Sequence, residues 1–331
     1  MQWNLLGHEW AVDFLSGQIA RGNLHHAYLF TGPTGVGRRT LALRFAQAIN
    51  CQDPPTPGQF CGACRACRGI AAQAHPDLVV VAAETVGGTL KIDQVRELGR
   101  FLSLAPYEAG RRIALLLRFE EAQRHAANAL LKTLEEPSDR VVLMLTAESP
   151  DLLPETILSR CQLIRLRPLP VRAFAERIGP TWGIPASEAE LLAHLSGGRP
   201  GIARLLNKDP ESLERRSEVL DRHVSLIPKT RRARFDFVGE AYRDRDMLRG
   251  SLELWAAYWR DVMILAAETT APLTNPDREA ELRTIAGQVS VETARRAVRS
   301  IEQTRDRIER NANTRLVLET LMLDLPRLRV K

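Results

Sequence analysis

The first half of the chain alternates short apolar runs with longer segments whose apolar residues recur at helical spacing. Each apolar run is bounded by turn residues, which is typical of a strand buried on both faces of a parallel sheet. The intervening segments place apolar residues on one face, as helices that pack on such a sheet do. This pattern predicts an α/β domain, with strands near 25–31, 78–82, 112–117, 141–146 and 163–166.

The second half of the chain has a helical pattern, in which apolar stripes alternate with charged faces. One stripe contains Trp255 and Trp259, which are spaced as neighbours on a helix. Bases stack on exposed aromatic side chains among basic residues, whereas this stripe is otherwise apolar. We therefore expect these tryptophans to anchor a helical core.

Prolines mark the expected domain boundaries. Pro168 and Pro170 interrupt the chain after the last predicted strand, and Asp209 with Pro210 marks a second break. A chain of 331 residues is long enough for two or three domains. We expect three, at 1–168, 169–209 and 210–331.

A glycine-rich turn follows the first predicted strand and opens the next helix. Gly32 and Gly37 have the spacing of a phosphate loop, G-x-x-x-x-G-K-[ST]. In that loop, backbone N–H groups cradle phosphates, the lysine reaches the β- and γ-phosphates, and the hydroxyl holds Mg²⁺. Here two arginines replace the lysine and the hydroxyl residue, and a threonine follows one position late. The candidate nucleotide-binding residues are Gly32, Gly35, Gly37, Arg38, Arg39 and Thr40.

A second magnesium position is altered as well. Active P-loop ATPases place an acidic residue at the end of the strand predicted here at 112–117, where this chain has Leu117 and Arg118. We expect Glu120 and Glu121 to begin the following helix, at its positive end. ATP hydrolysis is therefore not expected. Whether nucleotide still binds stays open, because a glycine-rich turn can serve packing alone.

Four of the five cysteines lie between residues 51 and 67. In a reducing compartment, such a cluster favours metal over disulfides. Cys61 and Cys64 can form a knuckle, with Cys67 at the start of the next helix and Cys51 at the end of the previous one. This set closes a tetrahedral site, which for zinc is structural because no position stays open for water. An iron–sulfur cluster is the competing metal centre, but a small proline-rich excursion needs structural support more than an electron carrier.

The charge and hydropathy of the chain limit its possible partners. The net charge of +6 comes largely from arginine, which suits phosphate contacts or protein interfaces without establishing nucleic-acid binding. No apolar run approaches the roughly 18 residues that span a bilayer, and the first residues lack a basic signal-peptide start. We therefore expect a cytoplasmic protein without a membrane partner.

Two further segments make the chain resemble the bacterial clamp-loader family. Residues 128–137 read Asn-Ala-Leu-Leu-Lys-Thr-Leu-Glu-Glu-Pro and precede an apolar strand, and residues 159–161 match the Ser-Arg-Cys motif of that family. These segments, the phosphate loop and the cysteines occur in the order found in that family. The resemblance implies an AAA+ P-loop domain with a zinc-binding insertion at 51–67, then a small helical lid and an all-α collar that assembles a hetero-pentameric ring.

The resemblance also implies roles for single residues. Arg160, flanked by Ser159 and Cys161, matches the arginine that reaches ATP bound in a neighbouring subunit. Thr146 matches the sensor-1 position after the fourth strand. Each residue has a simpler alternative, which is an exposed salt bridge for Arg160 and a hydroxyl that satisfies backbone groups for Thr146.

The altered phosphate loop decides which branch of the family the chain resembles. Tau and gamma subunits keep the lysine and the acidic pair, whereas delta prime subunits are similar throughout and do not hydrolyse ATP. We therefore expect a delta prime-like subunit that acts with delta and tau/gamma subunits, loads the sliding clamp on primed DNA, and supplies an arginine finger. The alternatives are an active tau/gamma-like ATPase and a stand-alone zinc protein that binds nucleic acid.

Overall fold

The computed structural model describes residues 2–85, 87–241, 245–309 and 312–328. The chain forms two compact units. The first spans residues 1–169 and includes a short segment at 199–201, and the second spans 170–198 and 202–331. The finer division into three domains stays a prediction.

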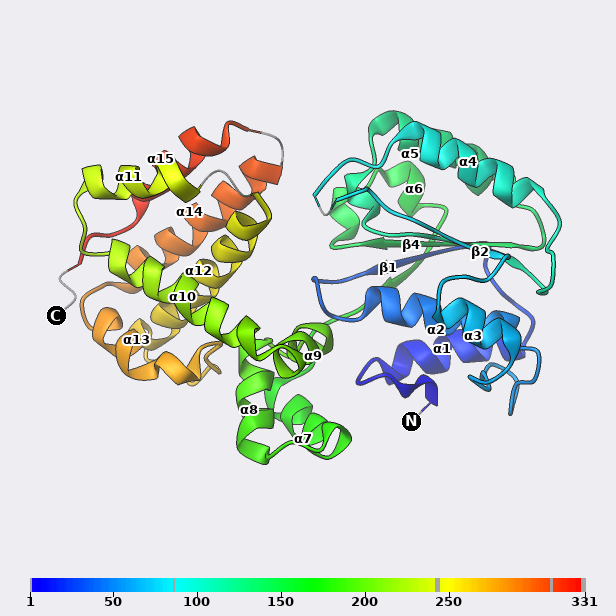
Figure 1. Cartoon of the computed structure of the whole chain (residues 1–331), viewed down its shortest axis with the longest axis horizontal. Helices are drawn as coiled ribbons and strands as arrows, with labels where there is room; N and C mark the ends of the chain where they lie inside the picture. Colours follow the sequence, from blue (N-terminus) through cyan, green and yellow to red (C-terminus); the bar gives the residue numbers. More distant parts are fainter. Residues whose placement is uncertain (1, 86, 242–244, 310–311, 329–331) are drawn as a thin grey trace. The chain divides into compact units, whose positions relative to one another are not determined.

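A parallel five-stranded sheet forms the centre of the first unit, as the sequence predicts (Figure 1). The strand order is β2-β3-β4-β1-β5, so that the strand before the glycine-rich turn lies between β4 and β5. Every residue of β1, β3 and β4 is buried, which explains why these strands are continuous apolar runs. The strands are β1 (Ala27–Thr31), β2 (Leu78–Val81), β3 (Arg112–Leu116), β4 (Val141–Ala147) and β5 (Gln162–Arg165).

Helices cover both faces of this sheet (Figure 1). Alternate residues of β1 face opposite sides, so Tyr28 and Phe30 join one core while Ala27 and Leu29 join the other. The first core packs against α1 (Glu9–Ala20), α2 (Arg38–Asn50) and α3 (Arg65–Ala71). The second packs against α4 (Ile92–Ser103), α5 (Arg124–Glu135) and α6 (Glu155–Leu158).

Two local expectations are wrong. His25 and His26 precede β1 instead of opening it. Glu120 and Glu121 do not begin a helix, because they lie in a 3₁₀ turn at Phe119–Glu121 and α5 starts later, at Arg124. The turn follows Arg118, whose left-handed backbone (φ 50°) reverses the chain at the end of β3.

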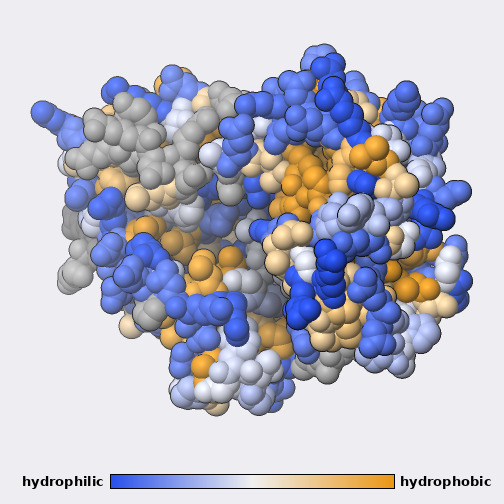
Figure 2. All heavy atoms as spheres, turned by 45° about the vertical axis from the view of Figure 1, so that its right-hand side comes forward, coloured by the Kyte–Doolittle hydropathy of each residue, from blue (hydrophilic) through white to orange (hydrophobic). Residues whose placement is uncertain are grey.

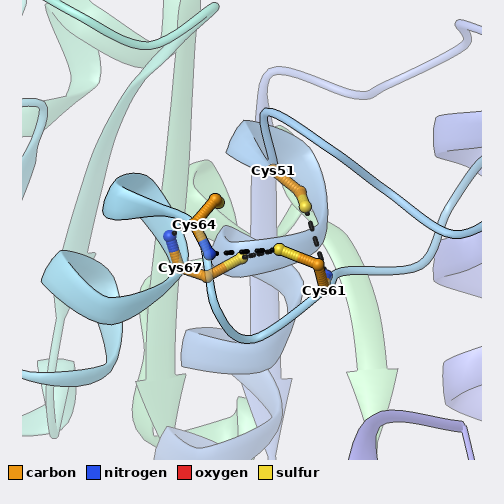
Figure 3. Close-up of side chains that lie close together, drawn as sticks. All are labelled: Cys51, Cys61, Cys64 and Cys67. Carbon is orange, nitrogen blue, oxygen red and sulfur yellow. Dashed lines mark hydrogen bonds between the residues drawn. The ribbon is translucent and has the colours of Figure 1, made fainter.

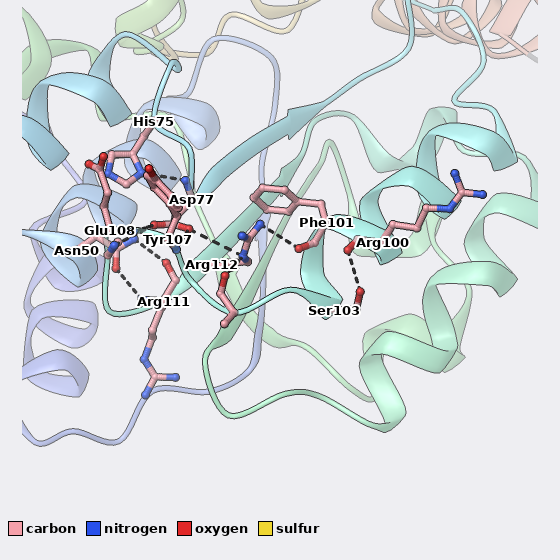
Figure 4. A network of polar contacts seen from close by, with 12 residues as sticks. Asn50, His75, Asp77, Arg100, Phe101, Ser103, Tyr107, Glu108, Arg111 and Arg112 are labelled. Atoms are coloured by element: carbon pink, nitrogen blue, oxygen red, sulfur yellow. Dashed lines mark hydrogen bonds and ion pairs between the residues drawn. The ribbon is translucent and has the colours of Figure 1, made fainter.

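A buried carboxylate anchors the loop between α4 and β3 (Figure 4). Asp77 precedes β2, is fully buried, and accepts backbone hydrogen bonds from Tyr107, Glu108 and Ala109 at 2.6–2.8 Å. Burial opposes ionisation of Asp77, but these donors and Arg112 outweigh it and lower the pKa of the carboxyl group. Polar contacts with a buried carboxylate therefore hold the loop in place.

The second unit is helical. Its core centres on α12, which packs against α10, α13 and α14, and buries Trp255 and Trp259 as the sequence predicts. The helices are α7 (Val171–Trp182), α8 (Ala186–Leu195), α10 (Pro210–Leu226), α11 (Arg231–Ala241), α12 (Arg245–Ala266), α13 (Glu279–Ala286), α14 (Val291–Glu309) and α15 (Thr314–Asp324), while α9 (Pro200–Lys208) begins in the 199–201 segment.

A buried arginine joins three of these helices. Arg234 in α11 donates hydrogen bonds to five backbone carbonyl groups. Two of these carbonyls lie at the end of α10, and three lie in or after the last turn of α15. Because the last carbonyls of a helix lack partners within that helix, one guanidinium satisfies the ends of two helices. The accepting residues are Leu226, Ile227, Met322, Leu325 and Pro326.

Polar residues dominate the face of the molecule drawn in Figure 2, with apolar residues in patches between them. Several large apolar side chains are exposed, including Leu104 (61%) and Tyr107 (76%) in the anchored loop. Among the described residues, none of the helices has the length and apolar character that crossing a membrane requires.

Candidate functional site

The glycine-rich turn between β1 and α2 has a backbone conformation that favours glycine. Gly32, Gly35 and Gly37 all adopt positive φ values, and Gly37 precedes the first residue of α2. A Cβ atom at Gly32 would lie 2.4 Å from the carbonyl oxygen of Leu166, so no other residue fits there. His8 contacts the Val36 carbonyl oxygen through Nε2 at 3.0 Å, which pins the turn from α1. Contacts within the protein, with Leu166 and His8, thus fix the turn.

Arg38 occupies the lysine position of this loop and is directed toward an acidic side chain. Its side chain is 10% exposed, and its Nη1 lies 4.0 Å from Oε1 of Glu120. Burial lowers the pKa of Arg38 and raises that of Glu120, while each charge favours the ionised form of the other. The end of β3 carries no acidic residue, but Glu120 in the following 3₁₀ turn lies near Arg38 of the glycine-rich turn.

The other loop residues do not gather around a magnesium position. Arg39 donates a hydrogen bond to Oε1 of Gln73 at 2.6 Å, and Thr40 is exposed on α2. Thr34 donates to Oε1 of Glu148 at 2.5 Å, so a second carboxylate lies over the turn. The structure brings Arg38 together with acidic residues, but it leaves Arg39 and Thr40 on the outside.

Thr146 is buried in β4, one residue before the end of that strand. Its Oγ1 accepts a hydrogen bond from the backbone N–H of Arg118 at 2.9 Å. The hydroxyl therefore satisfies a backbone group in the tight turn after β3, which matches the simpler alternative for this residue. Its sensor role stays a prediction.

The Ser-Arg-Cys motif follows α6 and presents its arginine at the surface. Cys161 packs against the second core, and burial raises the pKa of its thiol to about 12, so this cysteine serves packing. Arg160 donates from Nη1 to the Thr156 carbonyl oxygen (2.9 Å) and to Oγ of Ser159 (3.3 Å). Its Nη2 donates to Oε1 of Glu135 at 2.9 Å. The guanidinium is therefore oriented on several sides while 35% of the side chain stays exposed, and its ion pair with Glu135 matches the simpler alternative for this residue. Its finger role stays a prediction.

The four clustered cysteines form a candidate metal centre (Figure 3). Their sulfur atoms lie within 4.8 Å of one another, and a tetrahedral zinc with bonds of about 2.3 Å would hold them about 3.8 Å apart. Cys51 follows the last residue of α2 and Cys67 lies in the first turn of α3, as the sequence predicts, and Cys64 is the N-cap of α3. Backbone N–H groups of Cys61, Cys64 and Cys67 each donate to the sulfur of another member. A Cys₄ set of this geometry fits zinc.

The cysteine-containing segment is docked on the first unit by several independent contacts. The Asn50 side chain exchanges two hydrogen bonds with the backbone of Arg111, which fixes the end of α2 beside Cys51. Trp3 donates to the Gly58 carbonyl oxygen at 3.2 Å. A Cβ atom at Gly58 would lie 2.3 Å from the Ser16 carbonyl oxygen, so glycine permits this close approach. Arg65 pairs with Glu108 at 2.8 Å, which links α3 to the anchored loop.

Sequence reasoning missed the acidic partners of both arginines. Glu120 lies near Arg38, Glu135 near Arg160, and Glu148 near the glycine-rich turn. Each pair is far apart in the sequence, so no sequence motif contains both members. The only available signal is the motif at 128–137, which contains Glu135.

A parallel five-stranded sheet with a glycine-rich turn between β1 and α2, followed along the chain by a helical unit, defines an α/β protein with a P-loop-like turn. Two family descriptions match this chain: "DNA polymerase III, delta subunit" over residues 7–170, and "DNA polymerase III, delta subunit, C terminal" over residues 211–326. The chain belongs to this DNA polymerase III subunit family, as its sequence motifs suggest.

Individual relatives agree with this assignment. The DNA polymerase III subunit delta prime of Pseudomonas aeruginosa is 38% identical over 222 residues, which cover 66% of this chain and 66% of that protein. The delta prime subunit of Bacillus subtilis is 27% identical over 95% of this chain and 94% of its own length. The tau subunit of Escherichia coli is 34% identical over 53% of this chain, but over only 27% of its own length.

Proposed function

We propose that this chain is a delta prime-type subunit of the bacterial clamp loader, which helps to place the sliding clamp on primed DNA without hydrolysing ATP itself. The observation that carries this proposal is the contact of Arg38 with Glu120 in the phosphate loop. A nucleotide phosphate would have to compete with Glu120 for the guanidinium. The two positions that supply magnesium ligands in active P-loop ATPases, a hydroxyl and an acidic residue, are occupied here by Arg39 and Leu117.

The active role of the subunit lies in Arg160, which acts on ATP held by a neighbouring subunit. A guanidinium placed on a γ-phosphoryl group stabilises the charge that develops in the transition state. The exposure of Arg160 and its fixed orientation support this role, because a finger must be accessible before assembly and positioned afterwards. Ser159 contributes by holding Nη1 of the arginine.

The rest of the molecule supports assembly. Residues 169–209 form a lid and residues 210–331 form a collar, through which the subunit joins delta and tau/gamma subunits in a hetero-pentameric ring in the cytoplasm. Cys51, Cys61, Cys64 and Cys67 hold one structural zinc ion, which stabilises the insertion and takes no part in chemistry. The match to tau subunits supports partners that share this fold.

The test is a clamp loader reconstituted with Arg160→Ala. The variant should fold and join the ring, yet clamp loading should slow because the interface served by this chain loses its finger. Arginine fingers are worth roughly 10³–10⁵ in rate where they act on the chemical step, and a ring with several sites will show a smaller loss. Arg160→Lys should resemble alanine, because an ammonium lacks the planar fork of arginine. Normal loading by Arg160→Ala would show that this residue is only a surface ion pair.

A further inference from the structure

We propose that Glu135 is a positioning residue for Arg160, and that it sets the orientation in which the arginine meets the neighbouring phosphate. This inference rests on the proposed role of Arg160. Glu135 is the last residue of α5, and its carboxylate accepts the hydrogen bond from Nη2 of Arg160 at 2.9 Å. The two residues come from different elements, so their contact fixes the motif relative to the helix.

The hydrogen bonds around the guanidinium divide its donors into two groups. Nη1 is directed toward the Thr156 carbonyl oxygen and Ser159, both of which belong to the short segment that carries the arginine. Among the residues that the structure describes, Glu135 is the one partner from outside that segment. A guanidinium has five N–H donors, so three such bonds leave two donors for a phosphoryl group. Without Glu135, the described contacts of the Arg160 guanidinium are with Thr156 and Ser159, and these residues move together with the motif.

The location of Glu135 argues against a purely stabilising role. An acidic residue at the end of a helix is unfavourable, because the last carbonyl groups carry partial negative charge. The ion pair is also open to solvent, with 35% of the Arg160 side chain and 50% of the Glu135 side chain exposed, and such pairs add little to stability. Orientation of the finger is the effect that this pair can supply, since a small misplacement of a catalytic group lowers rates strongly.

The experiment isolates the interface that this chain serves. The loader is reconstituted with ATPase subunits whose own Ser-Arg-Cys arginines are replaced by alanine, so that Arg160 is the remaining finger. Glu135→Ala should lower kcat for ATP by roughly threefold to thirtyfold with KM and ring assembly unchanged, as misplacement of a catalytic group predicts. Glu135→Gln should recover most of the rate, because its amide oxygen can still accept from Nη2. Glu136→Gln, at the adjacent exposed position, is the matched control and should behave as the parent.

A double substitution separates this inference from the proposed function. If Glu135 acts through Arg160, Glu135→Ala should cost nothing further once Arg160→Ala is present. An equal loss in both backgrounds, or a normal kcat for Glu135→Ala beside an impaired Arg160→Ala, would overturn the positioning role. A normal kcat for Arg160→Ala itself would instead remove the proposed function, and the inference with it.

Discussion

At the scale of single residues, buried polar groups without a complete set of partners mark the positions where the environment controls ionisation. His223 in α10 is fully buried and stacks on Trp255 with ring centroids 4.4 Å apart. Its Nε2 accepts from Nε1 of Trp259 at 2.8 Å, which requires a neutral ring with the proton on Nδ1. Burial, reinforced by the nearby charge of Arg234, lowers the pKa of His223 to about 3.

This histidine predicts an acid-sensitive second unit. The folded pKa lies below the unfolded value of about 6.5, so its contribution to stability is complete above that pH and is lost as the pH falls toward about 3. Within this window the free energy of unfolding should decrease by up to about 1.4 kcal/mol per pH unit from this group. Urea unfolding between about pH 7 and about pH 5 measures the slope. His223→Gln, which keeps an acceptor for Trp259, should flatten it, and an unchanged slope would contradict the assignment.

At the scale of elements, we expect the cysteine segment to depend on a metal and the sheet beside it to be stable without one. The segment between α2 and α3 has little apolar core of its own, whereas β1–β5 are packed on both faces. Structural zinc supplies on the order of 10 kcal/mol to small metal-dependent folds. We therefore expect one zinc per chain, whose removal by a chelator speeds amide hydrogen exchange at 51–67 and leaves β1 and β4 protected.

Substitutions of single cysteines provide the control for this prediction. Cys64→Ser should lose the metal, whereas Cys161→Ser should keep it, because Cys161 lies outside the cluster. Elemental analysis measures the metal directly. Iron with a visible absorption band would identify the competing iron–sulfur centre instead.

Arg234 gives a second prediction about elements, because it links α10, α11 and α15. Arg234→Met keeps most of the side-chain volume but leaves five carbonyl groups without this donor. We expect a loss of about 3–5 kcal/mol in the free energy of unfolding of the second unit, as for other broken buried charge networks. Urea unfolding with hydrogen exchange at α15 measures it. Arg231→Met, in the same helix but exposed, should change stability by less than about 0.5 kcal/mol.

The elements were largely predictable from the sequence, and their tertiary partners were not. The strands could be located because burial on both faces requires continuous apolar runs, and the cysteine knuckle because ligand spacing is local. Glu120 was wrongly predicted to begin a helix. Arg118 has a left-handed backbone and a tight turn follows it, and hydrophobic periodicity does not predict such a turn. Three of the five carbonyl partners of Arg234 are backbone atoms about ninety residues away, so no side-chain pattern records them.

At the scale of the whole molecule, two fully folded units without a complete ATPase site predict an isolated chain that does not turn over ATP. Arg38, Arg39, Leu117 and Arg118 together remove the phosphate lysine and the magnesium ligands. Hydrolysis by the purified chain should stay at background, and Arg38→Lys alone should not restore it. Multiple turnover by the chain, abolished by a loop variant, would favour the active tau/gamma-like alternative. Tight, salt-dependent binding of the chain alone to DNA would favour the stand-alone nucleic-acid protein.

The contacts of Arg234 also determine when the second unit can complete its folding during synthesis of the chain. The arginine leaves the ribosome well before its partners in and after α15, which lie 88 to 92 residues later. At about 5–20 residues per second, 88 residues take roughly 4–18 s to synthesise. During that interval the sheet-containing unit is complete, while the helical unit still lacks the segment that closes it. Under the proposed function, we therefore expect assembly with partner subunits through that unit to follow the translation of Pro326.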